Sequence, residues 1–171
     1  MKTKYVISLL TVALGFAIIG TMLTDTRAKA DTESSARVNV KALTAKLEFL
    51  GDTPVLTGRP LLIEFWATWC PPCRASIAHL NELDKKYHNL GLQIVGISGE
   101  DKTVVEHFRT GTPMHYALAL DADQALAREF QVETIPHAWL LDKEGRVIWS
   151  GPPMDLEEQT IIRLLPTPPA T

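Results

Sequence analysis

The chain has 171 residues, 46% of them apolar and 22% charged, which is enough to bury one good core without a second domain. Without residues 1–30, which hold four of the 17 basic and one of the 20 acidic residues, 13 basic and 19 acidic residues remain, a formal charge of −6. This acidic balance argues against nucleic acid as a partner.

The N-terminus has the pattern of an export signal. Lys2 and Lys4 precede an uncharged run over residues 5–23, and Ala28-Lys29-Ala30 offers a cleavage site between small residues. The run is longer than an ordinary signal core, so an uncleaved membrane anchor is the alternative to a signal peptide. In either case we expect residues 1–30 to direct the chain into the periplasm or another extracytoplasmic space.

The rest of the chain divides into a polar spacer, residues 31–37, and one predicted domain, residues 38–171. Residues 38–50 are apolar enough for an ordered element, which could be a strand or a helix. From residue 61 onward, strand and helix patterns alternate as parallel βαβ units require, and a β-hairpin and a closing helix follow. The predicted strands span residues 61–66, 92–98, 117–120, 138–142 and 146–150, and the predicted helices span residues 72–88, 103–110, 124–130 and 156–165.

A buried strand gives way to a helix at the first of two cysteines. The apolar run of residues 61–66 predicts the strand, and Pro71-Pro72 cannot extend it because neither ring donates to a ladder. Proline is tolerated in the first turn of a helix, so Pro72 predicts the helix start, with Pro71 extended before it. Cys70 would then lie at the helix N-terminus, where free N–H groups and the helix dipole favour a thiolate.

Cys73 follows three residues later, on the same helical face, and is predicted to be the less exposed cysteine. This spacing permits attack by Cys70 on a disulfide and release by Cys73. A structural disulfide and half of a zinc site are the two alternatives. A structural zinc site usually needs four protein ligands, and the chain contains only these two cysteines, so the pattern favours a redox pair.

The stretch Phe65-Trp66-Ala67-Thr68-Trp69-Cys70-Pro71-Pro72-Cys73-Arg74 resembles the active-site segment of thioredoxin-like proteins of the TlpA/ResA type. The resemblance runs from about residue 50 to near the C-terminus. It implies an α/β thioredoxin-like fold, with a mixed central sheet flanked by helices on both faces and one additional βα unit within residues 85–121. It also implies thiol–disulfide exchange outside the cytoplasm.

Glu64 is an acidic residue inside an otherwise apolar strand. Buried carboxyl groups are rare unless they are paired or functional, because desolvation disfavours the charged form. The resemblance places Glu64 at the position of a buried aspartate that relays the proton of the second cysteine in thioredoxins. An outward-facing strand acid is the alternative, since strand side chains alternate between two faces.

Three further residues are expected to contact substrate. Thr134-Ile135-Pro136 resembles the family loop whose cis-proline packs against the cysteines, which would leave the backbone of Ile135 open to an extended substrate. A proline that merely starts a strand is the alternative. Trp69 flanks the nucleophile and would offer partners an apolar surface, although it could also serve packing alone.

The sequence departs from the family pattern just after the dithiol. Ser76 stands where many relatives carry Glu, and Ala78 where many carry a helix-kinking Pro. The chemistry of the cysteines does not depend on that kink, but the helix should run straighter than in those relatives.

These observations predict an extracytoplasmic thiol–disulfide oxidoreductase that reduces disulfides of exported proteins through Cys70 and Cys73. We expect no cofactor beyond that redox-active pair, no metal, a monomeric protein and a membrane thiol electron donor. A copper metallochaperone using the same cysteines, a disulfide oxidase and a peroxidase on the same fold are the alternatives.

Overall fold

A computed structural model describes residues 37–166. The predicted signal peptide or anchor at residues 1–30 lies outside these residues. Within the described part, no helix is both long and apolar enough to cross a membrane. The helices are α1 (Val40–Lys46), α2 (Pro71–Tyr87), α3 (Lys102–Gly111), α4 (Ala125–Glu129) and α5 (Glu158–Ile162), with short 3₁₀ turns at His88–Leu90 and Pro153–Asp155. The strands are β1 (Glu48–Phe49), β2 (Leu61–Trp66), β3 (Gln93–Ser98), β4 (Ala117–Leu120), β5 (His137–Leu141) and β6 (Val147–Gly151).

The strands of residues 37–166 form one six-stranded sheet in the order β1-β4-β3-β2-β5-β6. The inner strands β2, β3 and β4 run parallel, while β5 pairs antiparallel with β2, β6 with β5, and β1 with β4. The sheet is therefore mixed, as predicted. The segment 85–121, where the additional βα unit was expected, contains β3, α3 and β4.

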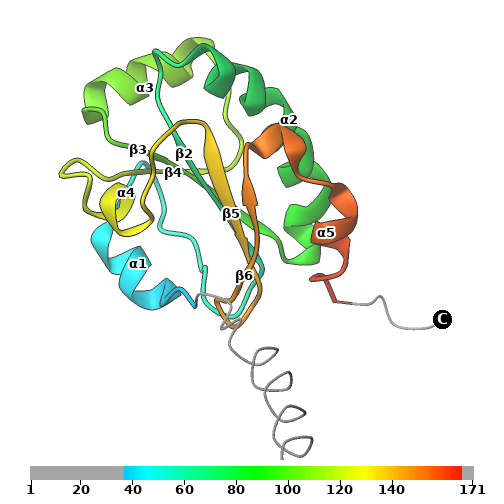
Figure 1. Cartoon of the computed structure of the whole chain (residues 1–171). Coiled ribbons are helices and arrows are strands. Elements are labelled where there is room, and N and C mark those ends of the chain that lie inside the picture. Colours follow the sequence, from blue (N-terminus) through cyan, green and yellow to red (C-terminus); the bar gives the residue numbers. More distant parts are fainter. Residues whose placement is uncertain (1–36, 167–171) are drawn as a thin grey trace, which may run out of the picture. The chain divides into compact units, whose positions relative to one another are not determined.

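Helices cover both faces of this sheet, which confirms the predicted thioredoxin-like architecture (Figure 1). Figure 1 shows α1 and α4 on one side and α2 and α5 on the other. The buried residues fall into two matching clusters. Leu61, Ile63 and Phe65 pack toward α1 and α4, whereas Leu62 and Trp66 pack toward α2. The alternation of strand side chains therefore turns Glu64 to the α2 face.

Most elements begin or end one residue away from the predicted boundary, and three differences bear on the fold. Helix α2 begins at Pro71, not Pro72, because both prolines fit the first helical turn, where no backbone N–H is needed. The open choice for residues 38–50 resolves into both a helix and a strand, α1 and β1. The closing helix is shorter than residues 156–165, since a 3₁₀ turn precedes α5 and turns follow Ile162.

Candidate active site

The two cysteines lie where β2 ends and α2 begins. Cys70 is the N-cap of α2, with an extended backbone, and its Sγ accepts a hydrogen bond of 3.2 Å from the N–H of Cys73. Cys70 and Cys73 form a disulfide with an S–S distance of 2.06 Å. After reduction, the same N–H and the positive end of a 17-residue helix would stabilise a thiolate on Cys70 more than on Cys73.

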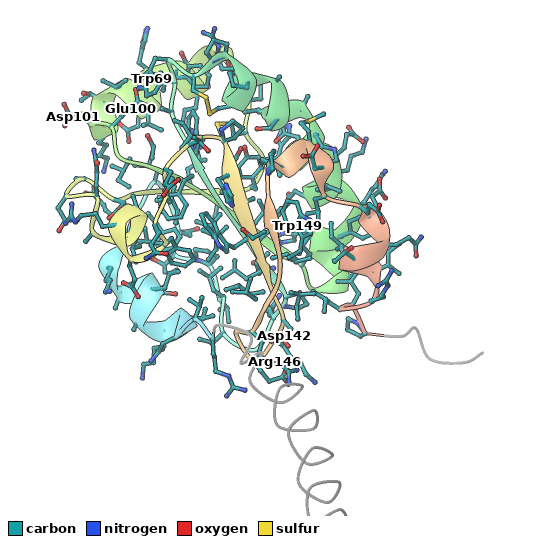
Figure 2. The ribbon with its side chains drawn as sticks, in the orientation of Figure 1. Trp69, Glu100, Asp101, Asp142, Arg146 and Trp149 are labelled. Carbon is teal, nitrogen blue, oxygen red and sulfur yellow. A yellow bond between two sulfur atoms is a disulfide. The ribbon has the colours of Figure 1, made fainter. Side chains whose placement is uncertain are left out.

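Trp69 is an exposed aromatic side chain immediately before Cys70. Trp69 is 68% exposed, whereas Cys70 is 2% and Cys73 0% exposed. Cys73 is thus the less exposed cysteine, as predicted, although the margin in the disulfide state is small. Figure 2 shows Trp69 at the end of the molecule opposite to Asp142 and Arg146.

The loop before β5 lies against Cys70. The peptide bond between Ile135 and Pro136 is cis, as the resemblance implied. Cys70 Sγ lies 3.7 Å from the carbonyl oxygen of Ile135. A disulfide sulfur carries no hydrogen, so this approach is a contact and not a hydrogen bond. Pro136 has no N–H, so its backbone brings no donor toward the sulfurs.

Glu64 is completely buried between β2 and α2. Its neighbours in the sheet are Gly96 on β3 and Ala138 on β5, two small residues. Burial raises the pKa of Glu64 to about 8, although a hydrogen bond with Ser76 acts in the opposite direction. Ser76 Oγ lies 2.7 Å from Glu64 Oε1. The outward-facing alternative for Glu64 is therefore wrong, while its part in proton transfer stays a prediction.

A clamp on the loop before the cysteines was not foreseen from the sequence. The carboxylate of Glu100 accepts hydrogen bonds from the N–H and the Oγ1 of Thr68, both at 2.7 Å, and a longer one of 3.2 Å from Ser98 Oγ. Glu100 follows the carboxyl end of β3, beside the carboxyl end of β2. Parallel strands present such ends at one edge of a sheet, and that rule could have suggested the contact.

A hollow of about 260 Å³ opens beside the dithiol. Trp69 and Ile135 both line it, so two of the predicted substrate-contacting residues face one space. Its other walls include apolar side chains such as Val132 and the carboxylates of Glu100 and Asp121. Those carboxylates are already engaged, because Asp121 accepts the backbone N–H groups at the start of α4.

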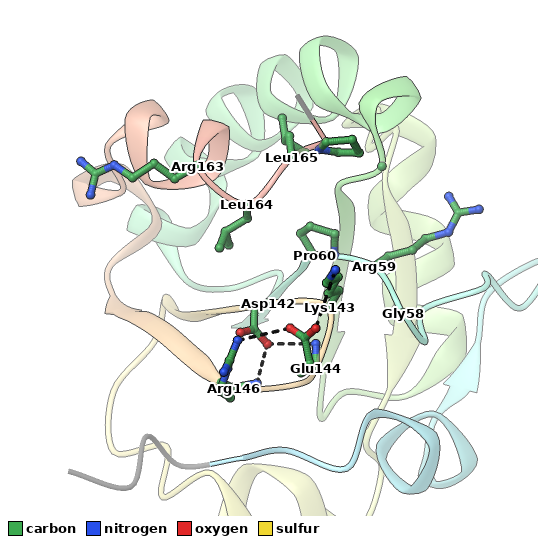
Figure 3. A pocket seen from close by; sticks show the side chains of 12 residues that line it. Gly58, Arg59, Pro60, Asp142, Lys143, Glu144, Arg146, Arg163, Leu164 and Leu165 are labelled. Atoms are coloured by element: carbon green, nitrogen blue, oxygen red, sulfur yellow. Dashed lines mark hydrogen bonds and ion pairs between the residues drawn. The ribbon is translucent and has the colours of Figure 1, made fainter. Parts of the chain in front are cut away.

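A second hollow, of about 550 Å³, lies at the end of the molecule away from the cysteines. Figure 3 shows Asp142, Glu144 and Arg146 joined to one another along one of its walls. Lys143 also pairs with Glu144, so two basic and two acidic side chains balance each other within the β5–β6 turn. This hollow therefore has a structural turn in its wall and none of the predicted catalytic groups.

Cys70 is bonded to Cys73 and contacts Ile135, which Pro136 follows in the chain. Glu64 reaches the carbonyl of Cys73 through Ser76, and Trp69 lies on the adjoining surface. Within residues 37–166, no group of three or more His, Cys, Asp or Glu side chains is placed to share a metal ion. Once reduced, Cys70 and Cys73 are the residues that could hold a soft cation such as Cu(I). The geometry otherwise suits nucleophilic sulfur chemistry beside a proton-holding carboxyl group.

Comparisons with known proteins point to the same chemistry. The AhpC/TSA family model matches residues 39–150. The thiol-disulfide oxidoreductase ResA of Bacillus thuringiensis (strain Al Hakam) is 30% identical over 94 residues, 54% of each chain. ResA of Geobacillus thermodenitrificans (strain NG80-2) is 28% identical over 143 residues, 83% of this chain and 80% of the relative. The chain thus spans about half the length of the first relative and four fifths of the second.

Among solved structures, a candidate thiol:disulfide interchange protein DsbE from Chlorobium tepidum superposes with a TM-score of 0.61. It is 29% identical, and the match covers 69% of this chain and 92% of the other. This likeness supports the thioredoxin-like fold.

Proposed function

The chain belongs to the AhpC/TSA family, and we propose that it is an extracytoplasmic thiol–disulfide oxidoreductase that reduces disulfides of exported proteins. One observation carries this proposal: Cys70, disulfide-bonded to Cys73, caps the N-terminus of α2 beneath the loop of cis-Pro136. A cysteine at that place is activated as a nucleophile, and its partner three residues later is placed to resolve the intermediate.

The first step is attack on the substrate. The Cys70 thiolate attacks one sulfur of a substrate disulfide, the substrate S–S bond breaks, and a mixed disulfide with Cys70 forms. The released substrate sulfur leaves as a thiolate and takes a proton from water. The N–H of Cys73, which donates to Cys70 Sγ, would stabilise the attacking thiolate.

The second step closes the disulfide of the protein. Cys73 gives its proton to the Glu64 carboxylate and attacks Cys70 Sγ. The Cys70–Cys73 bond forms, the bond between Cys70 and the substrate breaks, and the second substrate sulfur leaves. Two electrons have then passed to the substrate. Burial raises the pKa of Glu64 to about 8, close to the ordinary thiol value of about 8.5, so its carboxylate is basic enough to accept the Cys73 proton.

We expect the protein to act as a reductant. Strong oxidants of this kind stabilise the reduced thiolate heavily, whereas here two prolines add no charge between the cysteines and Glu64 opposes negative charge on Cys73. The potential should therefore lie nearer to about −270 mV, the thioredoxin value, than to about −120 mV, the DsbA value. Regeneration would require a dithiol donor in the membrane.

The test is equilibration of the purified protein with glutathione buffers, followed by thiol titration and a turbidity assay with insulin as the disulfide substrate. We expect a reducing potential, together with insulin reduction that Cys70→Ser abolishes. A potential near the DsbA value would instead identify an oxidase. Stoichiometric Cu(I) binding without insulin reduction would identify a metallochaperone, and peroxide consumption without insulin reduction would identify a peroxidase.

Its place outside the cytoplasm is tested separately. Cell fractionation and N-terminal sequencing should find the protein outside the cytoplasm, starting at Asp31 if the signal is cleaved or at Met1 if residues 5–23 stay as an anchor. Full-length protein that accumulates in the cytoplasm would contradict both outcomes. Sedimentation of the same sample tests the expected monomer.

A further inference from the structure

Ser76 is a completely buried hydroxyl on α2, one turn after Cys73. Its Oγ lies 2.7 Å from Glu64 Oε1 and 2.8 Å from the carbonyl oxygen of Cys73. If Glu64 is ionised, both neighbours can only accept a hydrogen bond, yet a serine hydroxyl carries a single hydrogen. One of the two buried contacts would then have no hydrogen in it.

A protonated Glu64 supplies the missing hydrogen. The carboxylic acid O–H donates to Ser76 Oγ, and the Ser76 hydroxyl donates to the carbonyl of Cys73, so that each contact contains one hydrogen. An O···O contact of 2.7 or 2.8 Å with no hydrogen in it is repulsive, which favours the protonated arrangement. The contacts around the disulfide therefore fit a Glu64 that already holds a proton, which is the product of the second step proposed above.

We propose that Ser76 is a positioning residue of the dithiol chemistry, whose hydroxyl hydrogen points to the Cys73 carbonyl while Glu64 is protonated and turns to Glu64 once that carboxyl is ionised. The inference rests on the proposed function, since Cys73 is the source of the proton. In the reduced protein the Ser76 hydroxyl stabilises the carboxylate and keeps it ready to accept that proton. When Cys73 attacks Cys70 Sγ, its proton moves to Glu64 and the Ser76 hydrogen returns to the carbonyl.

Other ionisable groups near Glu64 do not account for a titration at neutral pH. Tyr116 is buried just before β4, and its pKa is raised well above the usual value by burial, then by Glu64 and by Asp84 of α2. Gly96 is the β3 residue paired with Glu64, and a Cβ added to Gly96 would lie 3.1 Å from the Tyr116 ring. The ring therefore lies close to the strand position of Glu64. The phenol therefore stays neutral, and Cys73 does not titrate while it is in the disulfide.

The oxidised protein offers a test that does not depend on any activity. Infrared spectra between pH 5 and pH 10 should contain a protonated-carboxyl stretch that titrates with a midpoint near 8 and that Glu64→Gln abolishes. In Ser76→Ala the midpoint should rise by about one pH unit, because the bond that stabilises the carboxylate is gone. No such band in the wild-type protein, or an unshifted midpoint in a folded Ser76→Ala variant, overturns the proposal.

A kinetic cycle then separates positioning from packing. We would measure the pH dependence of oxidation of the reduced protein by glutathione disulfide in the wild type, in both single variants and in the double variant. Ser76→Ala should move the midpoint of the profile upward in the wild-type background and leave it unchanged in the Glu64→Gln background. Equal shifts in both backgrounds would assign Ser76 to packing alone. If the infrared midpoint shifts in Ser76→Ala but the wild-type protein does not reduce insulin, the contact between Ser76 and Glu64 stands and the proposed function is refuted instead.

Discussion

Replacing Glu64 by glutamine should remove a large pH dependence from the stability of the oxidised protein. Glu64 has a pKa of about 8 in the folded state, against 4.5 for an ordinary glutamate, because it is buried. A carboxyl group whose folded pKa is raised binds more protons in the folded state between those values. The free energy of unfolding therefore falls as the pH rises from about 4.5 to about 8, and it levels off above that.

The size of this effect follows from the two pKa values. At about 1.4 kcal/mol per pKa unit, a rise from 4.5 to about 8 corresponds to a total loss of about 5 kcal/mol, of which about 4 falls between pH 5 and pH 9. Glutamine does not titrate. Its NH₂ group can donate to Ser76 Oγ as the protonated carboxyl does, but Glu64 makes no other hydrogen bond within residues 37–166, so the rest of the amide would be unpaired. That unpaired amide costs about 1–3 kcal/mol at every pH.

The two stability curves should therefore cross. The variant should be the less stable protein at pH 5 and equally or more stable at pH 9. Urea unfolding of the oxidised proteins at pH values from 5 to 9 measures both curves. Glu106→Gln, the same change at an exposed position of α3, serves as the control and should follow the wild type. A difference between Glu64→Gln and wild type that stays constant over this range would refute a buried carboxyl that titrates near 8.

Three further changes test other parts of the structure. Cys73→Ser should trap a mixed disulfide between Cys70 and its substrates on non-reducing gels, and equal trapping by Cys70→Ser would reverse the assigned roles. Glu100→Gln can accept only one of the two short bonds from Thr68, so insulin reduction should slow several-fold while unfolding costs about 1–3 kcal/mol less; an unchanged rate would make the clamp dispensable. Asp142→Ala loses the hydrogen bonds that hold the β5–β6 turn and should destabilise the protein by about 2–3 kcal/mol in urea, with the rate per folded molecule unchanged.

The chain's local pattern was sufficient to place the chemistry on the fold. Strand β2 is a short apolar run, and two prolines end it in a way that only a helix start accommodates. Cys70 therefore has to cap α2, whatever the remainder of the molecule does. The alternation of strands and helices after residue 61 was equally legible, because each element shows its own period along the sequence.

The N-terminal end of the domain and the loop before β5 were less predictable. Residues 38–50 are too short and too evenly apolar to favour one period, and they form both α1 and β1. The cis bond before Pro136 came from the resemblance and not from the residues, since an X–Pro bond is usually trans.

The surroundings of the dithiol depended on contacts between segments far apart in sequence. Strand periodicity predicts that Glu64 and Ile63 point to opposite faces of β2, but both faces are buried. Only the packing of α2 on one face places Ser76 against the Glu64 carboxyl group. Glu100 reaches Thr68 across 32 positions because β2 and β3 lie side by side and end at the same edge. The sequence by itself determined which residues are nucleophilic, since that depends on the local helix start. The tertiary structure decided that Glu64 can hold a proton beside Ser76 and that Glu100 fixes the loop at Thr68, since burial and hydrogen bonding arise only when distant segments meet.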